Sequence, residues 1–171
     1  MKKIILFVLT LVVSAQEPRW ENEYDQPLHF TCPSYESIYY ISSTHHNKYE
    51  DRLWSFSCKR TFENIPLCSW SGYVNDFDQQ FEFTCPPNSA ISGMYSYHDN
   101  KREDRRWKFY CCSDSKICYS NCKWTDYVNG FDEPMSWTVP SSYYLVGASS
   151  YHDNHREDRR WKYQICMRHS C

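Results

Sequence analysis

The sequence repeats itself three times, and this repetition constrains the fold more than any other feature. Residues 96–108 and 150–162 differ only at Lys101, which corresponds to His155, and a more divergent copy begins at Trp20. Self-similarity at such a period indicates one supersecondary unit packed against copies of itself. We therefore expect one domain made of three repeats. Their approximate bounds are 20–69, 70–123 and 124–171.

Residues 1–15 have the features of a secretory signal peptide. Two lysines precede a short apolar run, and small residues lead to a predicted cleavage site after Ala15. The run holds about ten residues, whereas a bilayer-spanning helix needs about 20. We therefore predict a secreted mature chain, residues 16–171, in the extracellular space or matrix, with no membrane insertion. Of the 19 Lys and Arg, 17 then remain against 21 Asp and Glu. Nucleic-acid-binding domains are usually basic, so we predict no nucleic-acid partner.

Each repeat alternates with the period of a β-strand. Around Trp107, the apolar residues Phe109 and Cys111 occupy every second position and polar residues fall between them. Trp54 and Trp161 begin the same pattern in the other repeats, so we expect the tryptophan face to be buried. The sequence predicts an all-β domain, with a β-trefoil-like or β-prism-like arrangement about a pseudo-threefold axis. Further strands of the second repeat are expected at 80–85 and 90–97.

All ten cysteines lie in the predicted mature chain, and an even number in an exported protein indicates disulfides. The repeats suggest how the cysteines pair. The first two repeats have cysteines at two matching positions, and the third repeat has Val139 and Ile165 at these positions. Both members of a bonded pair must be lost together if no lone thiol is to remain. The expected bridges are Cys32–Cys58, Cys85–Cys111, Cys68–Cys112, Cys122–Cys166 and Cys118–Cys171. An exchange of partners between the adjacent Cys111 and Cys112 is the alternative.

A motif Asp-Arg-x-Trp-x-aromatic recurs at residues 51–56, 104–109 and 158–163, and a Cys-Cys pair follows the second copy. Together with the cysteine spacing, this motif resembles the dermatopontin family over essentially the whole mature chain. The resemblance implies an extracellular binding protein. Vertebrate members are associated with proteoglycan, collagen and cell adhesion, and invertebrate hemagglutinin/amebocyte aggregation factors with agglutination and carbohydrate binding. The chain lacks the long Tyr- and Asp-rich arm of vertebrate members, so its build is closer to the invertebrate factors.

The repeated motif favours a structural role over a binding role. Arg105 shares the buried face with Trp107, and a buried arginine needs a carboxylate partner, for which Asp104 or Glu103 is the local candidate. We predict a structural clamp in each repeat. Its residues are Asp51, Arg52, Trp54, Asp104, Arg105, Trp107, Asp158, Arg159 and Trp161.

A polar loop and the outward strand face beside it form the candidate ligand site in the second and third repeats. The loop carries donors and acceptors that suit sugar hydroxyls, and the strand face carries two cations. The alternative is an ordinary solvated turn that uses Asn and Asp for their backbone geometry. The candidate ligand-binding residues are Tyr97, His98, Asp99, Asn100, Arg106, Lys108, Tyr151, His152, Asp153, Asn154, Arg160 and Lys162.

Catalytic and metal-binding patterns are absent from the sequence. It has no Gly-x-Ser-x-Gly and no nucleophile–base set at a recognised spacing, and its His and Cys residues lack zinc-site spacing. We therefore predict no enzyme, metal or cofactor. The leading hypothesis is a secreted multivalent adhesion or agglutination factor that binds cell-surface glycans or glycosaminoglycans. The alternative is a structural matrix protein that binds proteoglycan or collagen and promotes cell adhesion.

Overall fold

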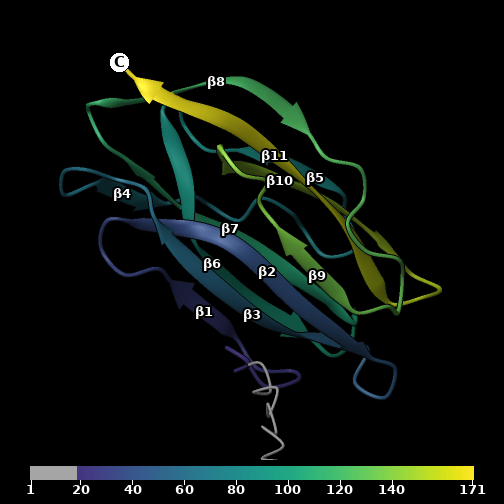
Figure 1. Ribbon diagram of the computed structural model, residues 1–171. Helices are drawn as coiled ribbons and strands as arrows, with labels where there is room; N and C mark the ends of the chain where they lie inside the picture. Colours follow the sequence, from purple (N-terminus) through teal and green to yellow (C-terminus); the bar gives the residue numbers. More distant parts are fainter. Residues whose placement is uncertain (1–18) are drawn as a thin grey trace, which may run out of the picture.

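The computed structural model describes residues 19–171 and is built from β-strands (Figure 1). The eleven strands are β1 (Leu28–Thr31), β2 (Glu36–His46), β3 (Asp51–Arg60), β4 (Leu67–Trp70), β5 (Phe81–Thr84), β6 (Ser89–Asp99), β7 (Asp104–Ser113), β8 (Ile117–Trp124), β9 (Met135–Thr138), β10 (Tyr143–Asp153) and β11 (Asp158–Ser170). The all-β prediction is confirmed. Residues 19–171 contain no helix that could cross a membrane. The predicted signal peptide lies outside the described residues.

Each repeat contributes one short strand followed by a long antiparallel hairpin. The hairpins are β2–β3, β6–β7 and β10–β11, and each has a register shift at the same place in its first strand. Two of these bulges contain glycine, Gly93 and Gly147. A Cβ on Gly93 would lie 2.5 Å from the backbone oxygen of Phe30, and one on Gly147 would lie 2.6 Å from that of Phe83. Glycine therefore allows a strand of the preceding repeat to approach closely.

The short strand of each repeat pairs with the hairpin of another repeat. β1 pairs with β6, β5 pairs with β10, and β9 pairs with β2. The resulting sheets have the orders β1-β6-β7-β4, β5-β10-β11-β8 and β3-β2-β9. Of the two expected arrangements, the prism-like one is the arrangement that three separate sheets match. The exchange of short strands also links the three repeats into a closed ring.

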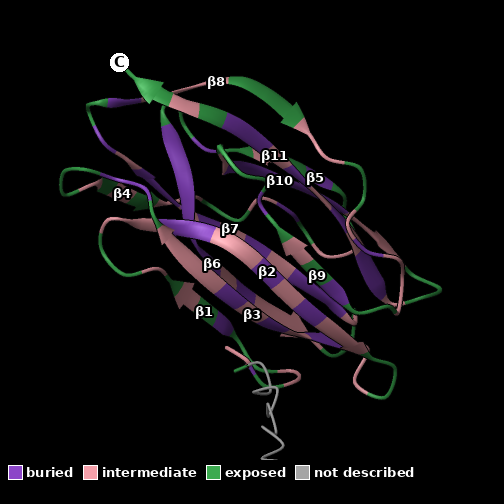
Figure 2. Ribbon diagram, in the orientation of Figure 1, coloured by how far each residue is buried: buried purple, intermediate pink, exposed green. Residues whose placement is uncertain are grey.

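The core lies where the three sheets meet, and it is built mainly from aromatic rings. Trp54, Trp107 and Trp161 are each at most 1% exposed. They meet edge to face, with ring centroids 4.8–5.3 Å apart, the arrangement that aromatic pairs favour. Exposed residues gather in loops, along β8 and at the end of β11 (Figure 2). The predicted burial of the tryptophan face is therefore confirmed.

The five disulfides are the pairs that the repeats predict, and the exchange of Cys111 and Cys112 does not occur. Cys32–Cys58 and Cys85–Cys111 each close a chain segment of 26 residues inside one repeat. In the third repeat the corresponding positions are Val139 and Ile165, which are 4% and 1% exposed. One buried contact is therefore made by a disulfide in two repeats and by apolar packing in the third.

We expect the double variant Val139→Cys/Ile165→Cys to form a further disulfide. The backbone at this position matches the bridged repeats: the N–H of Val139 donates to the Tyr39 carbonyl at 2.8 Å, as that of Cys32 does to the Ser92 carbonyl at 2.7 Å. Closing this loop should raise the free energy of unfolding by about 2–4 kcal/mol over the same variant with this bond reduced. Mass spectrometry after alkylation and thermal unfolding measure both effects. The two single variants are controls and should be destabilised. Free thiols in the folded double variant would contradict the prediction.

Candidate functional site

A closed ring of buried ion pairs surrounds the pseudo-threefold axis. The pairs are Arg52–Asp158, Arg105–Asp51 and Arg159–Asp104, each joined through Nε and Nη2 at 2.6–2.7 Å. The six side chains are only 2–5% exposed. Each pair joins two different repeats. The prediction that Arg105 pairs locally with Asp104 or Glu103 is therefore wrong: its partner is Asp51.

The physical reason lies in strand geometry. Asp104 and Arg105 are consecutive residues of β7, so their side chains point to opposite faces and Asp104 reaches the arginine of the next repeat. Each ring carboxylate also anchors a loop. Asp51 Oδ2 accepts the backbone N–H of Asp25 at 2.9 Å, and the same bond recurs at the other two positions. The clamp residues therefore hold the repeats together across their boundaries.

A small axial pocket is lined by three copies of the residue types Glu, Asp, Arg and Trp, one from each repeat. Its volume of about 20 Å³ is room for roughly one water-sized group. The Asp and Arg residues of the lining pair with one another in the ring. Glu50, Glu103 and Glu157 do not take part in those pairs, so they leave the pocket with an excess of negative charge. We call these residues the axial glutamates. The sequence signal for them is the Glu that precedes Asp-Arg in every repeat.

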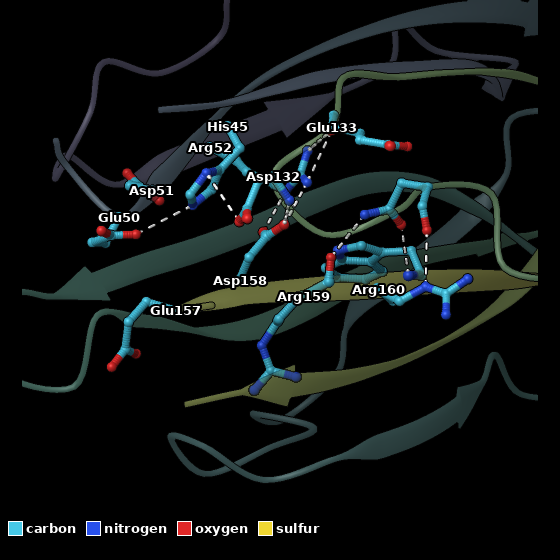
Figure 3. Close-up of polar contacts among 12 residues, drawn as sticks. His45, Glu50, Asp51, Arg52, Asp132, Glu133, Glu157, Asp158, Arg159 and Arg160 are labelled. Atoms are coloured by element: carbon cyan, nitrogen blue, oxygen red, sulfur yellow. Dashed lines mark hydrogen bonds and ion pairs between the residues drawn. The ribbon is translucent and has the colours of Figure 1, made fainter. Parts of the chain in front are cut away.

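Three histidines accompany the axial glutamates: His45, His98 and His152, whose side chains are 1% exposed. His98 Nδ1 lies 3.2 Å from Asn100 Oδ1 and 3.5 Å from Asp25 Oδ1, and its Nε2 lies 3.7 Å from Glu103 Oε2. Figure 3 shows the equivalent His45 between Glu50 and Asp132. These histidines are therefore enclosed by carboxylates from two repeats.

The carboxylates of this cluster influence one another. Burial raises the pKa of the Glu103 carboxyl, and the negative charges of Asp25, Glu157 and Glu50 act in the same direction, while His98 opposes them. Burial also raises the pKa of Glu157, again against the effect of its histidine. The negative charge of Glu50 contributes to the raised pKa of both the Glu103 and the Glu157 carboxyls. The axial glutamates therefore form one electrostatic unit.

The polar residues of the predicted ligand loop are occupied by contacts within the turn. Asp99 Oδ1 accepts the backbone N–H groups of Lys101 and Arg102, both at 3.0 Å. Asp153 does the same in the third repeat, and these two bonds hold the pKa of its carboxyl below the usual value. Asn100 faces His98, and Asn154 faces His152 at 3.0 Å. These contacts are those of the turn alternative, and a ligand role for His98, Asp99, Asn100 and their copies stays a prediction.

The remaining candidates lie on the outer surface of the hairpins among aromatic rings. On β6–β7 the guanidinium of Arg106 and the ammonium of Lys108 lie 4.6 and 4.2 Å from the ring centroid of Tyr73. Tyr97 packs edge to face on Tyr73 and on Phe77, both at 5.5 Å. Tyr73 is 38% exposed. We call these five residues the outer face of repeat two.

The third repeat builds a matching outer face from Tyr127, Phe131, Tyr151, Arg160 and Lys162. Arg160 lies 4.6 Å from the ring centroid of Tyr127, which is 41% exposed, and Tyr151 packs edge to face on both aromatic rings. Lys162 lies 5.2 Å from the ring centroid of Trp124. The first repeat has Leu53 and Ser55 in place of the two cations. The structure therefore brings together Tyr, Arg and Lys of the predicted site in two repeats and adds two aromatic residues that the sequence analysis missed.

Comparisons with known proteins agree with the family resemblance of the repeated motif. The family model described as Dermatopontin matches residues 22–171. A hemagglutinin/amebocyte aggregation factor of Limulus polyphemus is 49% identical over 170 residues, which cover 98% of this chain and 96% of the relative. Millepora cytotoxin-1 of Millepora dichotoma is 40% identical over 85% of this chain and 65% of its own length. A dermatopontin of Biomphalaria glabrata is 40% identical over 82% of this chain and 95% of its own length. No solved structure matches. None of these names is that of an enzyme, in agreement with the prediction that the chain acts by binding.

Removing one arginine of the ion-pair ring should destabilise the whole domain. We expect Arg105→Ala to lower the free energy of unfolding by about 3–5 kcal/mol, because it leaves the buried Asp51 carboxylate unpaired. Arg102→Ala is the control, since Arg102 pairs with Asp78 at 3.1 Å while 58% exposed and should contribute only about 0–1 kcal/mol. Chemical denaturation followed by tryptophan fluorescence measures both. Equal losses in the two variants would show that the ring does not have this role.

Proposed function

Because the chain belongs to the dermatopontin family, we propose that it is a secreted, multivalent adhesion or agglutination factor that binds cell-surface or matrix glycans. The name of the Limulus relative, hemagglutinin/amebocyte aggregation factor, supports agglutination, and the five disulfides support export to an oxidising compartment. The observation that carries glycan binding is the pair of matching outer faces on repeats two and three.

Each outer face combines the two kinds of contact that an acidic sugar needs. The apolar C–H face of a sugar ring packs on an exposed aromatic ring, and a tyrosine hydroxyl adds a hydrogen-bonding group at the edge. Arg106 and Lys108 supply positive charge beside Tyr73, and guanidinium groups bind sulfate and carboxylate through paired hydrogen bonds. Sulfated or carboxylated glycans are therefore the proposed ligand class.

Two faces on one rigid body explain how a single chain would link two cells. The faces lie on different sheets, β6–β7 in one and β10–β11 in another, so each is free to engage a separate glycan. Linked binding of two weak sites raises avidity by about 10²–10⁴ over one site. The first repeat keeps the buried clamp but has no cations at the outer positions, and we assign it a supporting role.

A second candidate, binding to matrix proteins, is favoured by a separate observation. Ile65, in the loop that leads to β4, and Leu67, the first residue of β4, are 81% and 83% exposed and offer apolar surface to a partner. Exposed apolar surface of this kind suits contact with a protein surface more than contact with a sugar. The variant Ile65→Ser/Leu67→Ser should reduce binding to collagen or to a proteoglycan core protein and leave agglutination unchanged if both functions exist.

Removal of the cations from the outer faces tests the two-site proposal. We expect Arg106→Ala/Lys108→Ala and Arg160→Ala/Lys162→Ala each to keep binding to a monovalent sulfated glycan but to lose most agglutination of erythrocytes. The four-residue combination should lose both. The control Lys48→Ala/Lys116→Ala removes two exposed cations elsewhere and should behave as the unmodified chain. Normal agglutination by a folded four-residue variant would rule the proposal out.

Salt should weaken binding to a charged glycan. Raising the salt concentration from about 0.1 to 1 M shortens the Debye length from about 10 to 3 Å, and the exposed cations of the outer faces are then screened. We expect the affinity for heparin-like oligosaccharides, measured by surface plasmon resonance, to fall progressively over this range. An affinity that is independent of salt would indicate a neutral sugar ligand instead.

A further inference from the structure

Aromatic rings continue beyond the outer face of repeat two, across the sheet β1-β6-β7-β4. The ring centroid of Tyr95 lies 6.5 Å from that of Tyr73 and 6.4 Å from that of Trp70. Trp70 in turn lies 4.9 Å from Tyr110. The exposed ring of His29 on β1 packs edge to face on Tyr95 and on Trp70, at 5.8 and 5.5 Å. We call His29, Trp70, Tyr95 and Tyr110 the aromatic extension.

The strand register explains why these rings form a continuous strip with the two cations. Arg106, Lys108 and Tyr110 are alternate residues of β7, so their side chains point to the same face of the sheet. Across the ladders each has an aromatic neighbour in its own row, namely Tyr97, Tyr95 and Trp70. Four residues of β7 from the first row to the last span about 14 Å. A pyranose is a six-membered ring like that of tyrosine, so the strip is long enough for more than one sugar unit.

A pocket opens at the end of the strip that lies away from Arg106. Its volume is about 450 Å³, and Trp70, Tyr110 and Thr31 belong to its lining. Small-molecule sites usually have volumes of about 300–1,000 Å³. The lining includes one carboxylate, Glu36, which lies opposite Arg60 in the β2–β3 ladder, so the negative charge is balanced locally. The strip therefore leads from the cations to a cavity with room for a further sugar unit.

The third repeat has the same strand register but a different set of residues at these positions. Trp124 takes the place of Trp70. By strand pairing, the counterparts of Tyr95, Tyr110 and His29 are Ser149, Gln164 and Glu82. Ser149 is only 9% exposed, and the side-chain oxygen of Gln164 accepts the hydroxyl of Thr84 at 2.7 Å. The row that carries Lys162 therefore offers no aromatic ring on β10 or β5 to a second sugar unit.

The charge of this row also differs between the two faces. Glu82 is exposed on β5, and Ser149 separates it from Lys162 in the same row. Neighbouring strands are about 4.8 Å apart, so the carboxylate lies about 10 Å from the cation across the sheet. An acidic glycan that bound at Lys162 and extended across the strands would bring its next negative charge toward Glu82. At the matching position of the second face, His29 carries no negative charge.

Given the proposed function, on which this inference rests, we propose that the two outer faces bind different parts of acidic glycans. The outer face of repeat two, together with the aromatic extension, binds several consecutive units of an acidic glycan chain. The outer face of repeat three binds a single acidic unit, and Glu82 opposes a longer bound segment. One molecule then links a long acidic chain to a terminal acidic sugar, so the two surfaces that it joins need not carry the same glycan.

Oligosaccharides of defined length test this difference. The variant Arg160→Ala/Lys162→Ala keeps only the cations of repeat two, and Arg106→Ala/Lys108→Ala keeps only those of repeat three. Binding of a heparin-derived disaccharide and hexasaccharide to each is measured by calorimetry. From disaccharide to hexasaccharide, we expect the affinity to rise at least about tenfold more in the first variant, since each added ring contact contributes about twofold to tenfold. The larger number of binding registers on a longer ligand affects both variants equally.

Exchange of residues between repeats locates the longer site. In the chain that keeps the repeat-two cations, Tyr95→Ser/Tyr110→Gln introduces the residues of the third repeat. It should remove the rise in affinity and leave disaccharide binding unchanged. His29→Glu changes one exposed residue and should weaken hexasaccharide binding alone, and it takes the place of the double variant if circular dichroism shows that the latter does not fold. Tyr40→Ser, on the outer surface of the sheet β3-β2-β9, is the control and should keep the full rise.

The outcomes distinguish the difference between the faces from the proposed function itself. If neither single-face variant binds either oligosaccharide, the proposed acidic-glycan function is wrong and the difference between the faces is wrong with it. If both variants bind and their affinities rise equally with ligand length, the acidic-glycan function stands and the difference is overturned. A rise that persists in folded Tyr95→Ser/Tyr110→Gln, or in His29→Glu where that variant takes its place, overturns the difference in the same way.

Discussion

The fold depends on three arginines that are buried beside carboxylates of a different repeat. Arg105 has Asp51 as its partner, and the other two pairs follow the same rule. A charge buried without a partner costs several kcal/mol, so no repeat is stable in its present form without both neighbours. The ring also fixes the number of repeats, because the arginine of the first repeat, Arg52, takes its carboxylate partner, Asp158, from the third repeat. Three of the five disulfides, Cys68–Cys112, Cys122–Cys166 and Cys118–Cys171, also join neighbouring repeats. The other two lie within one repeat each, and the third repeat packs without a bridge of that kind.

Because the repeats depend on one another for these ion pairs, the inner surface of each repeat is constrained and the outer surface is not. The inner residues Asp, Arg and Trp are the same in all three copies, since each repeat must satisfy its neighbours in the same geometry. The outer positions do not contact a neighbouring repeat in this way, so their residues differ between copies. Arg106 and Lys108 of the second repeat correspond to Leu53 and Ser55 of the first. Binding surfaces can therefore differ between repeats without a cost to the fold. Under the proposed function, two binding faces and a supporting first repeat would coexist on one symmetrical body in this way.

The repeats explain which parts of the structure could be predicted from sequence. Alternation around Trp107 revealed the strands and their buried face, and the joint loss at Val139 and Ile165 revealed the disulfide pairing, because both signals lie within one repeat. The partner of Arg105 and the pairing of β1 with β6 could not be predicted, since near-identical copies do not show which of them meet in space. His98 was placed in a polar ligand loop, and its enclosure was missed for the same reason: the carboxylate beside it, Asp25, comes from another repeat.

The exchange of short strands has a consequence for mechanical load. If repeats two and three are pulled apart by tethered cells, the tension between them passes through the disulfides Cys118–Cys171 and Cys122–Cys166. The ladder of β5 with β10 and the Arg159–Asp104 pair share this load in parallel. A second path runs the other way around the ring, through β1–β6 and β9–β2 by way of the first repeat. Force is thus shared between two routes, and neither can yield alone while the other holds. A closed ring of three repeats resists shear as a linear chain of two could not.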